Sequence, residues 1–72
     1  MEYIDAMRVD VNGQAAEVEP ETTVGGLVAL YAFERRHVAV EVNGELVRRP
    51  GYDATILHEG DHVEIVTLVG GG

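Results

Sequence analysis

Three consecutive glycines, Gly70, Gly71 and Gly72, follow an apolar, strand-like run in the segment VTLVGGG, residues 66–72. Because glycine has no Cβ, this is the thinnest peptide possible, and we expect residues 70–72 to form a flexible tail. Such a tail can enter a narrow channel of another protein and present the α-carboxylate of Gly72 there. An α-carboxylate is ionised at neutral pH and is a poor electrophile, so it needs activation, for instance as a mixed anhydride with AMP.

A second pattern with chemical potential, HEGDH at residues 58–62, matches the H-E-x-x-H motif of zinc proteases. In those enzymes a helix places both histidines on one face. Here a strand pattern begins directly after the motif, so we predict a tight turn around Gly60 instead of a helix. No third zinc ligand is evident, and a chain of 72 residues leaves little room for a catalytic cleft. We therefore predict no metal site, and we interpret His37 as a surface residue.

No other enzyme class has its pattern in this chain. Gly25-Gly26 lacks the Lys-Ser/Thr that completes a phosphate-binding loop, and no Ser-His-Asp arrangement can be argued from spacing. The carboxylates are typical of solvated faces. We therefore predict that the chain has no catalytic residues, binds no cofactor itself, and is not an enzyme in its own right. Activation of Gly72 must then come from a partner enzyme.

Composition limits the partners further. The chain is one small domain with no cysteine, and its formal net charge is -8, with arginine as its only basic residue type apart from histidine. Such a chain has little attraction for phosphate backbones, so we predict no nucleic-acid partner, while its acidity suits a protein with a basic face. No apolar stretch approaches the roughly 20 residues of a membrane span, and the first residues do not resemble a signal peptide. We expect no membrane association and a cytoplasmic location.

The elements that must carry the tail begin with two hairpin patterns. Residues 7–11 alternate in polarity and predict a strand, and Asn12-Gly13 after them is typical of a type I′ turn. Residues 14–18 then return as a second strand. A second hairpin is predicted with strands at 38–42 and 45–48 and its turn at 43–44. Residues 52–57 indicate a short helical turn or loop, and the alternation around Val63 and Ile65 predicts a last strand.

One helix is predicted between the hairpins. Thr22 or Thr23 can cap it by accepting a hydrogen bond from a free backbone N–H. Its apolar stripe has helical spacing and consists of Val24, Leu27, Val28 and Tyr31, widened by Leu30. A helix must bury such a stripe, and the open face of a sheet is the only partner here. The fold class is therefore α+β: a mixed sheet of about five strands packed on one main helix.

Two further expectations concern this helix. The glycines at 25 and 26 each cost about 1 kcal/mol relative to alanine, so the helix depends on packing, and they would allow close approach to a sheet. We place Arg35 and Arg36 near the helix end, where cations meet the negative end of the helix dipole.

The last strand predicts a docking surface. If Val63 and Ile65 face the core, the period of two puts Glu64, Val66 and Leu68 on the opposite face. Exposed apolar residues that lead toward the tail favour a partner site, to which Glu64 would contribute charge.

The whole pattern resembles a known family. A β-grasp, ubiquitin-like domain ending in Gly-Gly is similar to the sulfur-carrier proteins, and most closely to the thiamine-biosynthesis carriers of the ThiS family. The resemblance is carried by VDVNGQ (9–14), TTVGGLVALY (22–31), VAVEVNGELVRR (38–49) and LHEGDHVEIVTLVGGG (57–72). It implies a β-grasp domain over residues 1–69, with residues 1–6 as an amino-terminal extension, and the tail at 70–72.

The resemblance also implies a cycle. A ubiquitin-activating-like adenylyltransferase uses ATP and magnesium to adenylate Gly72, and a sulfur donor fed by a cysteine desulfurase converts it to a thiocarboxylate. The tail then enters thiazole synthase and donates sulfur to the thiazole ring of thiamine. In this cycle Gly70 and Gly71 give access, and Glu64, Val66 and Leu68 dock the partner.

Three alternatives stay open. Carriers of the same fold serve molybdopterin synthase or thioacid-based amino-acid synthesis with the same tail chemistry. A ubiquitin-like modifier would join Gly72 to a lysine of a target, although this chain has no lysine on which to build chains of itself. A structural domain with an inert tail would keep its function without Gly71 and Gly72.

Overall fold

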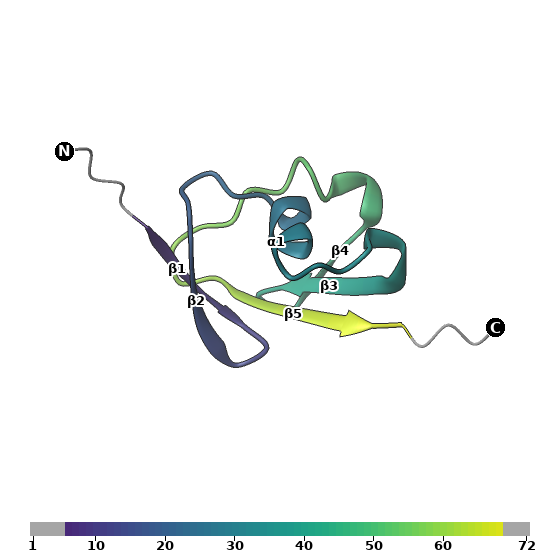
Figure 1. Cartoon of the computed structure of the whole chain (residues 1–72), viewed down its shortest axis with the longest axis horizontal. Helices are drawn as coiled ribbons and strands as arrows, with labels where there is room; N and C mark the ends of the chain where they lie inside the picture. The colour runs from purple at the N-terminus through teal and green to yellow at the C-terminus, as the bar shows by residue number, and fades with distance from the viewer. Residues whose placement is uncertain (1–5, 69–72) are drawn as a thin grey trace.

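The computed structural model of the chain describes residues 6–68, and Figure 1 shows their arrangement. The predicted tail at 70–72 and residues 1–5 of the predicted extension lie outside this range. The elements in chain order are β1 (Met7–Val11), β2 (Gln14–Val18), α1 (Val24–Leu30), the 3₁₀ turn η1 (Arg35–His37), β3 (Val38–Val42), β4 (Glu45–Val47), the 3₁₀ turn η2 (Arg49–Gly51) and β5 (His62–Thr67).

The five strands form one mixed sheet in the order β2-β1-β5-β3-β4. Strand β5 is parallel to β1 and antiparallel to β3, while each hairpin pair is antiparallel. Helix α1 lies across one face of this sheet (Figure 1) and shares its hydrophobic core. The predicted mixed sheet of about five strands on one main helix is confirmed, and the last strand of the chain occupies the centre of the sheet.

Both hairpin turns have the predicted backbone geometry. Asn12 and Gly13 have φ angles of 53° and 86°, and Asn43 and Gly44 have φ angles of 54° and 85°. Two successive positive φ values are what a type I′ turn requires, and Asn-Gly meets this need at low steric cost. The predicted strand at 45–48 ends one residue early, at Val47, because Arg48 precedes the turn η2.

The core confirms the period-two and helical patterns in most positions. Its buried members come from every strand except β4, from helix α1 and from the loop before β5. They are Val9, Val11, Val18, Val24, Leu27, Val28, Val38, Val40, Tyr52, Leu57, Val63 and Ile65. The helical turn expected within 52–57 lies slightly earlier, at η2, and Tyr52 and Leu57 anchor the following loop in the core.

Helix α1 begins as predicted and ends earlier than predicted. The Thr23 hydroxyl accepts a hydrogen bond from the Gly26 N–H at 3.0 Å, so Thr23 is the cap. Ala32 has a φ of 61° and breaks the helix, which therefore ends at Leu30. The prediction that Leu30 widens the buried stripe is wrong, because Leu30 is 68% exposed. Tyr31 is also 42% exposed and stacks on Phe33 with ring centroids 6.4 Å apart.

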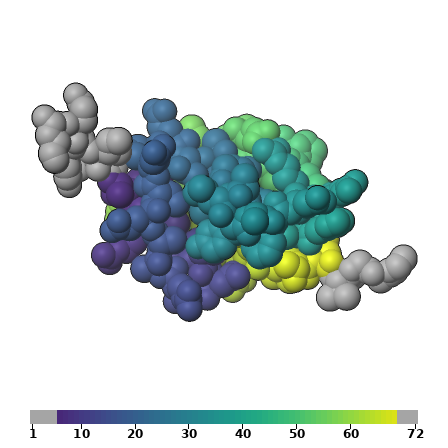
Figure 2. Space-filling view, viewed as in Figure 1, coloured from purple at the N-terminus to yellow at the C-terminus, as the bar shows by residue number. Residues whose placement is uncertain are grey.

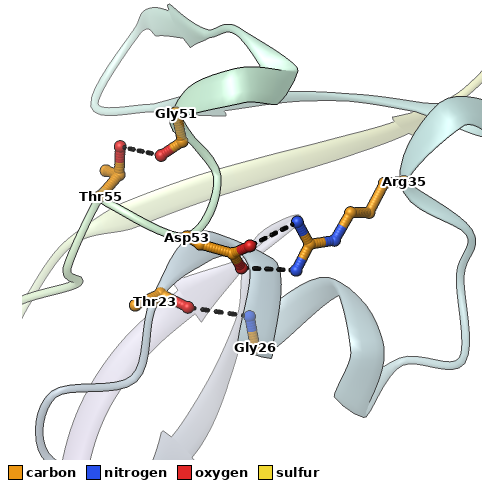
Figure 3. A network of polar contacts seen from close by, with 6 residues as sticks. All are labelled: Thr23, Gly26, Arg35, Gly51, Asp53 and Thr55. Carbon is orange, nitrogen blue, oxygen red and sulfur yellow. Dashed lines mark hydrogen bonds and ion pairs between the residues drawn. The ribbon is translucent and has the colours of Figure 1, made fainter.

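Two further expectations about this helix are also wrong. Arg35 lies in η1, beyond the end of α1, so it does not meet the α1 dipole; Arg36 lies in the same turn. The close approach at Gly25 is made by side chains and not by a sheet: a Cβ there would overlap the Asp53 carboxylate and the Arg35 guanidinium. Figure 3 shows this ion pair beside the first turn of the helix.

Within residues 6–68, none of the helices is both long and apolar enough to cross a membrane.

Candidate functional site

The site begins with the two faces of β5. Val63 and Ile65 are buried in the core, whereas Val66 is 56% and Leu68 45% exposed, and Glu64 is exposed as well. The predicted placement of Glu64, Val66 and Leu68 away from the core is therefore confirmed. Their role in docking stays a prediction.

Neighbouring strands extend this exposed surface. Val66 lies opposite Ala39 on β3, and Glu64 lies opposite Glu41. On the next strand Leu46 lies opposite Glu41 and is 60% exposed. The result is a surface with apolar residues toward the end of β5 and two carboxylates beside them. We call the residues Ala39, Leu46, Val66 and Leu68 the apolar docking patch.

The described chain is held in place as far as Leu68, its last described residue. Thr67 lies opposite Val38, and the Leu68 N–H donates a hydrogen bond to the His37 carbonyl at 2.7 Å. Leu68 also lines an open hollow of about 430 Å³ together with Ala39, Leu46 and Arg48. Figure 2 shows the end of β5, in yellow, at one extremity of the described surface. The proposed reactive residue Gly72 and the access residues Gly70 and Gly71 lie outside the described residues.

Two asparagine side chains brace β5, and neither was identified as more than a turn residue. The Asn12 amide accepts from the Ile65 N–H at 2.8 Å and donates to the Ile65 carbonyl at 3.1 Å, so it acts like one more residue of a neighbouring strand. The Asn43 amide accepts from the His62 N–H at 2.9 Å. Because Asn12 and Ile65 are far apart in the chain, local patterns contain no signal for this contact.

Two further ties hold the segments around the end of β5. The Arg49 guanidinium donates to the carbonyls of Arg35 and Arg36 at 3.1 and 3.0 Å, which joins η2 to η1. Arg35 in turn donates two hydrogen bonds to the carboxylate of Asp53, as Figure 3 shows. This pair lowers the pKa of Asp53, chiefly through the hydrogen bond from Arg35, and raises the pKa of Arg35 for the same reason.

The histidines of HEGDH are not arranged as in a zinc protease. The Asp61 carboxylate accepts from the His58 N–H at 2.8 Å, and Gly60 has a φ of 86°, which confirms the predicted tight turn. His62 starts β5 and faces Asp10, with 3.0 Å between Nδ1 and Oδ2. His37 is exposed, as predicted. In the part of the chain that the structure describes, no group of three or more potential ligands could hold a metal ion.

The strand order of the mixed sheet and the helix α1 packed across one of its faces together define a β-grasp, ubiquitin-like protein. The family model of the ThiS family matches residues 9–72, and the chain belongs to that family.

Individual relatives agree with this assignment. The sulfur carrier protein ThiS of Bacillus subtilis is 35% identical over 65 residues, which cover 89% of this chain and 98% of that protein. A crystal structure of a thiamine biosynthesis protein (ThiS) from Geobacter metallireducens superposes with a TM-score of 0.77 at 38% identity, covering 92% of this chain and 100% of that one.

A third relative is much longer. The thiazole synthase of Magnetococcus marinus is 39% identical over 66 residues, which cover 92% of this chain. The chain spans only 20% of the length of that protein.

Proposed function

We propose that this chain is a sulfur carrier of thiamine biosynthesis that acts as a co-substrate and not as an enzyme. One structural observation carries the proposal: the chain is held in place along the central strand and as far as Leu68, and it exposes Val66 and Leu68 a few residues before the glycines in the sequence. The family match, which continues to Gly72, and the Bacillus carrier of nearly equal length support it. A carrier needs a stable domain, a docking surface and a thin reactive end, and these residues fit the first two needs.

The proposed chemistry takes place at Gly72. A carboxylate oxygen attacks the α-phosphate of ATP, pyrophosphate leaves, and an acyl adenylate forms in the active site of an adenylyltransferase that holds ATP and Mg²⁺. The terminal sulfur of a persulfide donor, which a cysteine desulfurase charges, then attacks the carbonyl carbon, and AMP leaves as an acyl disulfide forms. A second thiol attacks the donor's sulfur of this S–S bond, so that a new disulfide forms on the donor and the acyl sulfur is released. The product is a thiocarboxylate on Gly72. Because the cycle consumes ATP, we place it in the cytoplasm.

Thiazole synthase is the proposed acceptor of the sulfur. The Magnetococcus thiazole synthase includes a segment similar to this chain, which supports a direct partnership between carrier and acceptor. In the proposed complex the apolar docking patch contacts the enzyme, Glu64 adds charge, and Gly70 and Gly71 pass through the entrance of its active site.

Intact-protein mass spectrometry tests the chemistry. We would incubate the chain with the adenylyltransferase of its host, ATP, Mg²⁺ and a sulfur donor. Exchange of one oxygen for sulfur adds about 16 Da, and fragmentation must place the gain on Gly72. A chain lacking Gly71 and Gly72 is the control and should gain nothing. If an active adenylyltransferase leaves the mass unchanged while Gly72 is found joined to lysines of other proteins, the chain is a modifier and our proposal is wrong.

A matched pair of substitutions tests the docking surface. Val66→Asp places a charge in the apolar docking patch, whereas Leu30→Asp places the same charge on an exposed leucine of α1. Both sites are exposed, so both variants should keep the fold, with changes in unfolding free energy within about 0.5 kcal/mol. We expect only Val66→Asp to slow formation of the thiocarboxylate. If the two variants form the thiocarboxylate at equal rates, Val66 does not belong to the docking surface.

A further inference from the structure

Four of the five arginines gather beside the end of β5, although the chain as a whole carries a net charge of -8. Arg35 and Arg36 belong to η1, and Arg48 and Arg49 flank the start of η2. The only acidic residues in the sequence segments 34–37 and 48–53 are Glu34 and Asp53. This end of the molecule is therefore locally basic, in contrast to the rest of the chain.

Two of these arginines are engaged in structural contacts. Arg35 pairs with Asp53, and Arg49 donates to the carbonyls of residues 35 and 36, so both hold η1 and η2 together. The other two retain free hydrogen-bonding capacity. Arg36 contacts Glu34 at 3.4 Å with both side chains largely exposed, and Arg48 has no carboxylate within 4.0 Å among residues 6–68.

The guanidinium groups of Arg36 and Arg48 lie near Leu68, the last described residue before the glycines in the sequence. Arg48 lines the same hollow as Leu46 and Leu68 of the apolar docking patch. Arg36 precedes His37, whose carbonyl accepts the hydrogen bond from Leu68. Figure 1 shows the short turns after α1 and after β4 at the same end of the molecule as the tip of β5. A protein that takes the tail must therefore pass within reach of both arginines.

We propose that Arg36 and Arg48 form a basic docking surface that binds carboxylate side chains at the channel entrance of the adenylating enzyme. This inference rests on the proposed function, in which that enzyme is the first to receive the tail. Arginine is suited to the task, because its planar guanidinium binds a carboxylate through two parallel hydrogen bonds. The rest of the acidic chain repels carboxylates, so this contact is available in one orientation only.

The positions of the acidic and the basic side chains predict the charge pattern on the surface of the partner enzyme. Glu64 and Glu41 lie beside one another on the outer face of the sheet, while Arg36 and Arg48 lie at the end of β5. A complementary enzyme surface carries basic groups opposite the first pair and acidic groups opposite the second. Complementary charge of this kind fixes register and speeds encounter more than it adds affinity.

Charge reversal with a matched control tests the surface. Arg48→Glu changes the charge at the proposed surface. Arg8→Glu makes the same change on β1, which pairs with the start of β5 and not with its end. ATP–pyrophosphate exchange by the host adenylyltransferase is measured against carrier concentration. We expect Arg48→Glu to raise KM about tenfold or more with kcat unchanged, and Arg8→Glu to change KM less than about twofold. Arg36→Glu is an independent second variant with the same expected effect as Arg48→Glu.

Salt provides a second readout. At about 1 M ionic strength the Debye length falls to about 3 Å, so the difference between the Arg48 and Arg8 variants should largely disappear. If Arg36→Glu and Arg48→Glu both behave like Arg8→Glu at low salt, while the unchanged chain supports exchange, the basic docking surface is wrong and the proposed function stands. If the unchanged chain supports no exchange with an enzyme that adenylates another carrier, the proposed function fails and this surface fails with it.

Discussion

Asp53 illustrates how one residue joins two segments that are distant in the sequence. Its carboxylate accepts two hydrogen bonds from Arg35 and lies over Gly25, where no larger residue would fit without displacing it. The pair therefore links the loop before β5 to η1. Both side chains are substantially exposed, so water screens the interaction, and its main effect is on position.

The pKa of Asp53 gives a prediction with a defined sign. Because the folded state lowers this pKa below its ordinary value of 3.8, the pair stabilises the fold above that pH and loses the effect as pH falls through the folded-state pKa. We expect Asp53→Asn to lower the unfolding free energy by the same amount across neutral and mildly acidic pH. Below about pH 4 the difference between the variant and the unchanged chain should decrease. Urea unfolding at a series of pH values measures it, and a difference that grows with acid would contradict the assignment.

Sequence patterns predicted residue roles well where the cause is local. The Thr23 cap and the positive φ values of both Asn-Gly turns depend on neighbours within four residues, and both were predicted. The Arg35–Asp53 pair and the contact between Asn12 and Ile65 were missed because the partners are separated by 18 and 53 residues. No local rule relates such positions.

The Asn12 side chain satisfies backbone hydrogen bonds of β5 that a neighbouring strand would otherwise satisfy. Asn12→Asp keeps the acceptor for the Ile65 N–H but replaces the donor to the Ile65 carbonyl with a carboxylate oxygen. We expect the unfolding free energy to fall by about 1–3 kcal/mol, since a partly buried carbonyl loses its partner. Gln14→Glu adds the same charge on an exposed residue of β2 and is the control. Equal effects in urea unfolding would show that only charge is responsible.

The two glycines of helix α1 offer a matched comparison. A Cβ at Gly26 would meet only Thr23 and Thr22 atoms at 3.5 and 3.6 Å, whereas a Cβ at Gly25 would overlap the Arg35–Asp53 pair. Alanine favours the helix over glycine by up to about 1 kcal/mol. We therefore expect Gly26→Ala to raise the unfolding free energy and Gly25→Ala to raise it less or lower it. Thermal unfolding monitored by circular dichroism compares them, and a larger gain at Gly25 would contradict the packing.

At the scale of elements, strands were predicted more accurately than the helix end. Alternation in β1, β3 and β5 reports directly on which side chains face the core, and those assignments agree with the observed burial. The end of α1 depends on the left-handed conformation of Ala32, and the residue type alanine does not predict a positive φ. Leu30 was consequently assigned to the buried face and is in fact exposed.

The order of strands in the whole molecule was not deducible from the chain's own patterns. Hairpin neighbours follow from the Asn-Gly turns, but the insertion of β5 between β1 and β3 pairs residues about 50 positions apart, such as Asp10 and His62. The resemblance to the β-grasp family implied a mixed sheet of about five strands, and the order of those strands comes from the structure. The positions of Glu64, Val66 and Leu68 followed from period two alone.

The net charge predicts how the whole molecule responds to salt. Thirteen acidic residues against five arginines leave the folded chain under self-repulsion, and Glu41 lies directly opposite Glu64. Raising ionic strength from about 0.01 M to about 1 M shortens the Debye length from about 30 Å to about 3 Å. We expect the melting temperature to rise over this range in sodium chloride. A steady fall would mean that the ion pairs, and not the repulsion, dominate.

The central place of β5 also governs how the protein is made. A ribosome synthesises β5 after every other strand, yet β5 is the strand that joins the β1–β2 hairpin to the β3–β4 hairpin. Until it emerges, the two hairpins have no common sheet, and Val9 and Val40 have no shared core. We therefore expect products that terminate before β5 to stay unfolded and to be open to proteases. Products of this kind would not persist as folded decoys that occupy a partner enzyme.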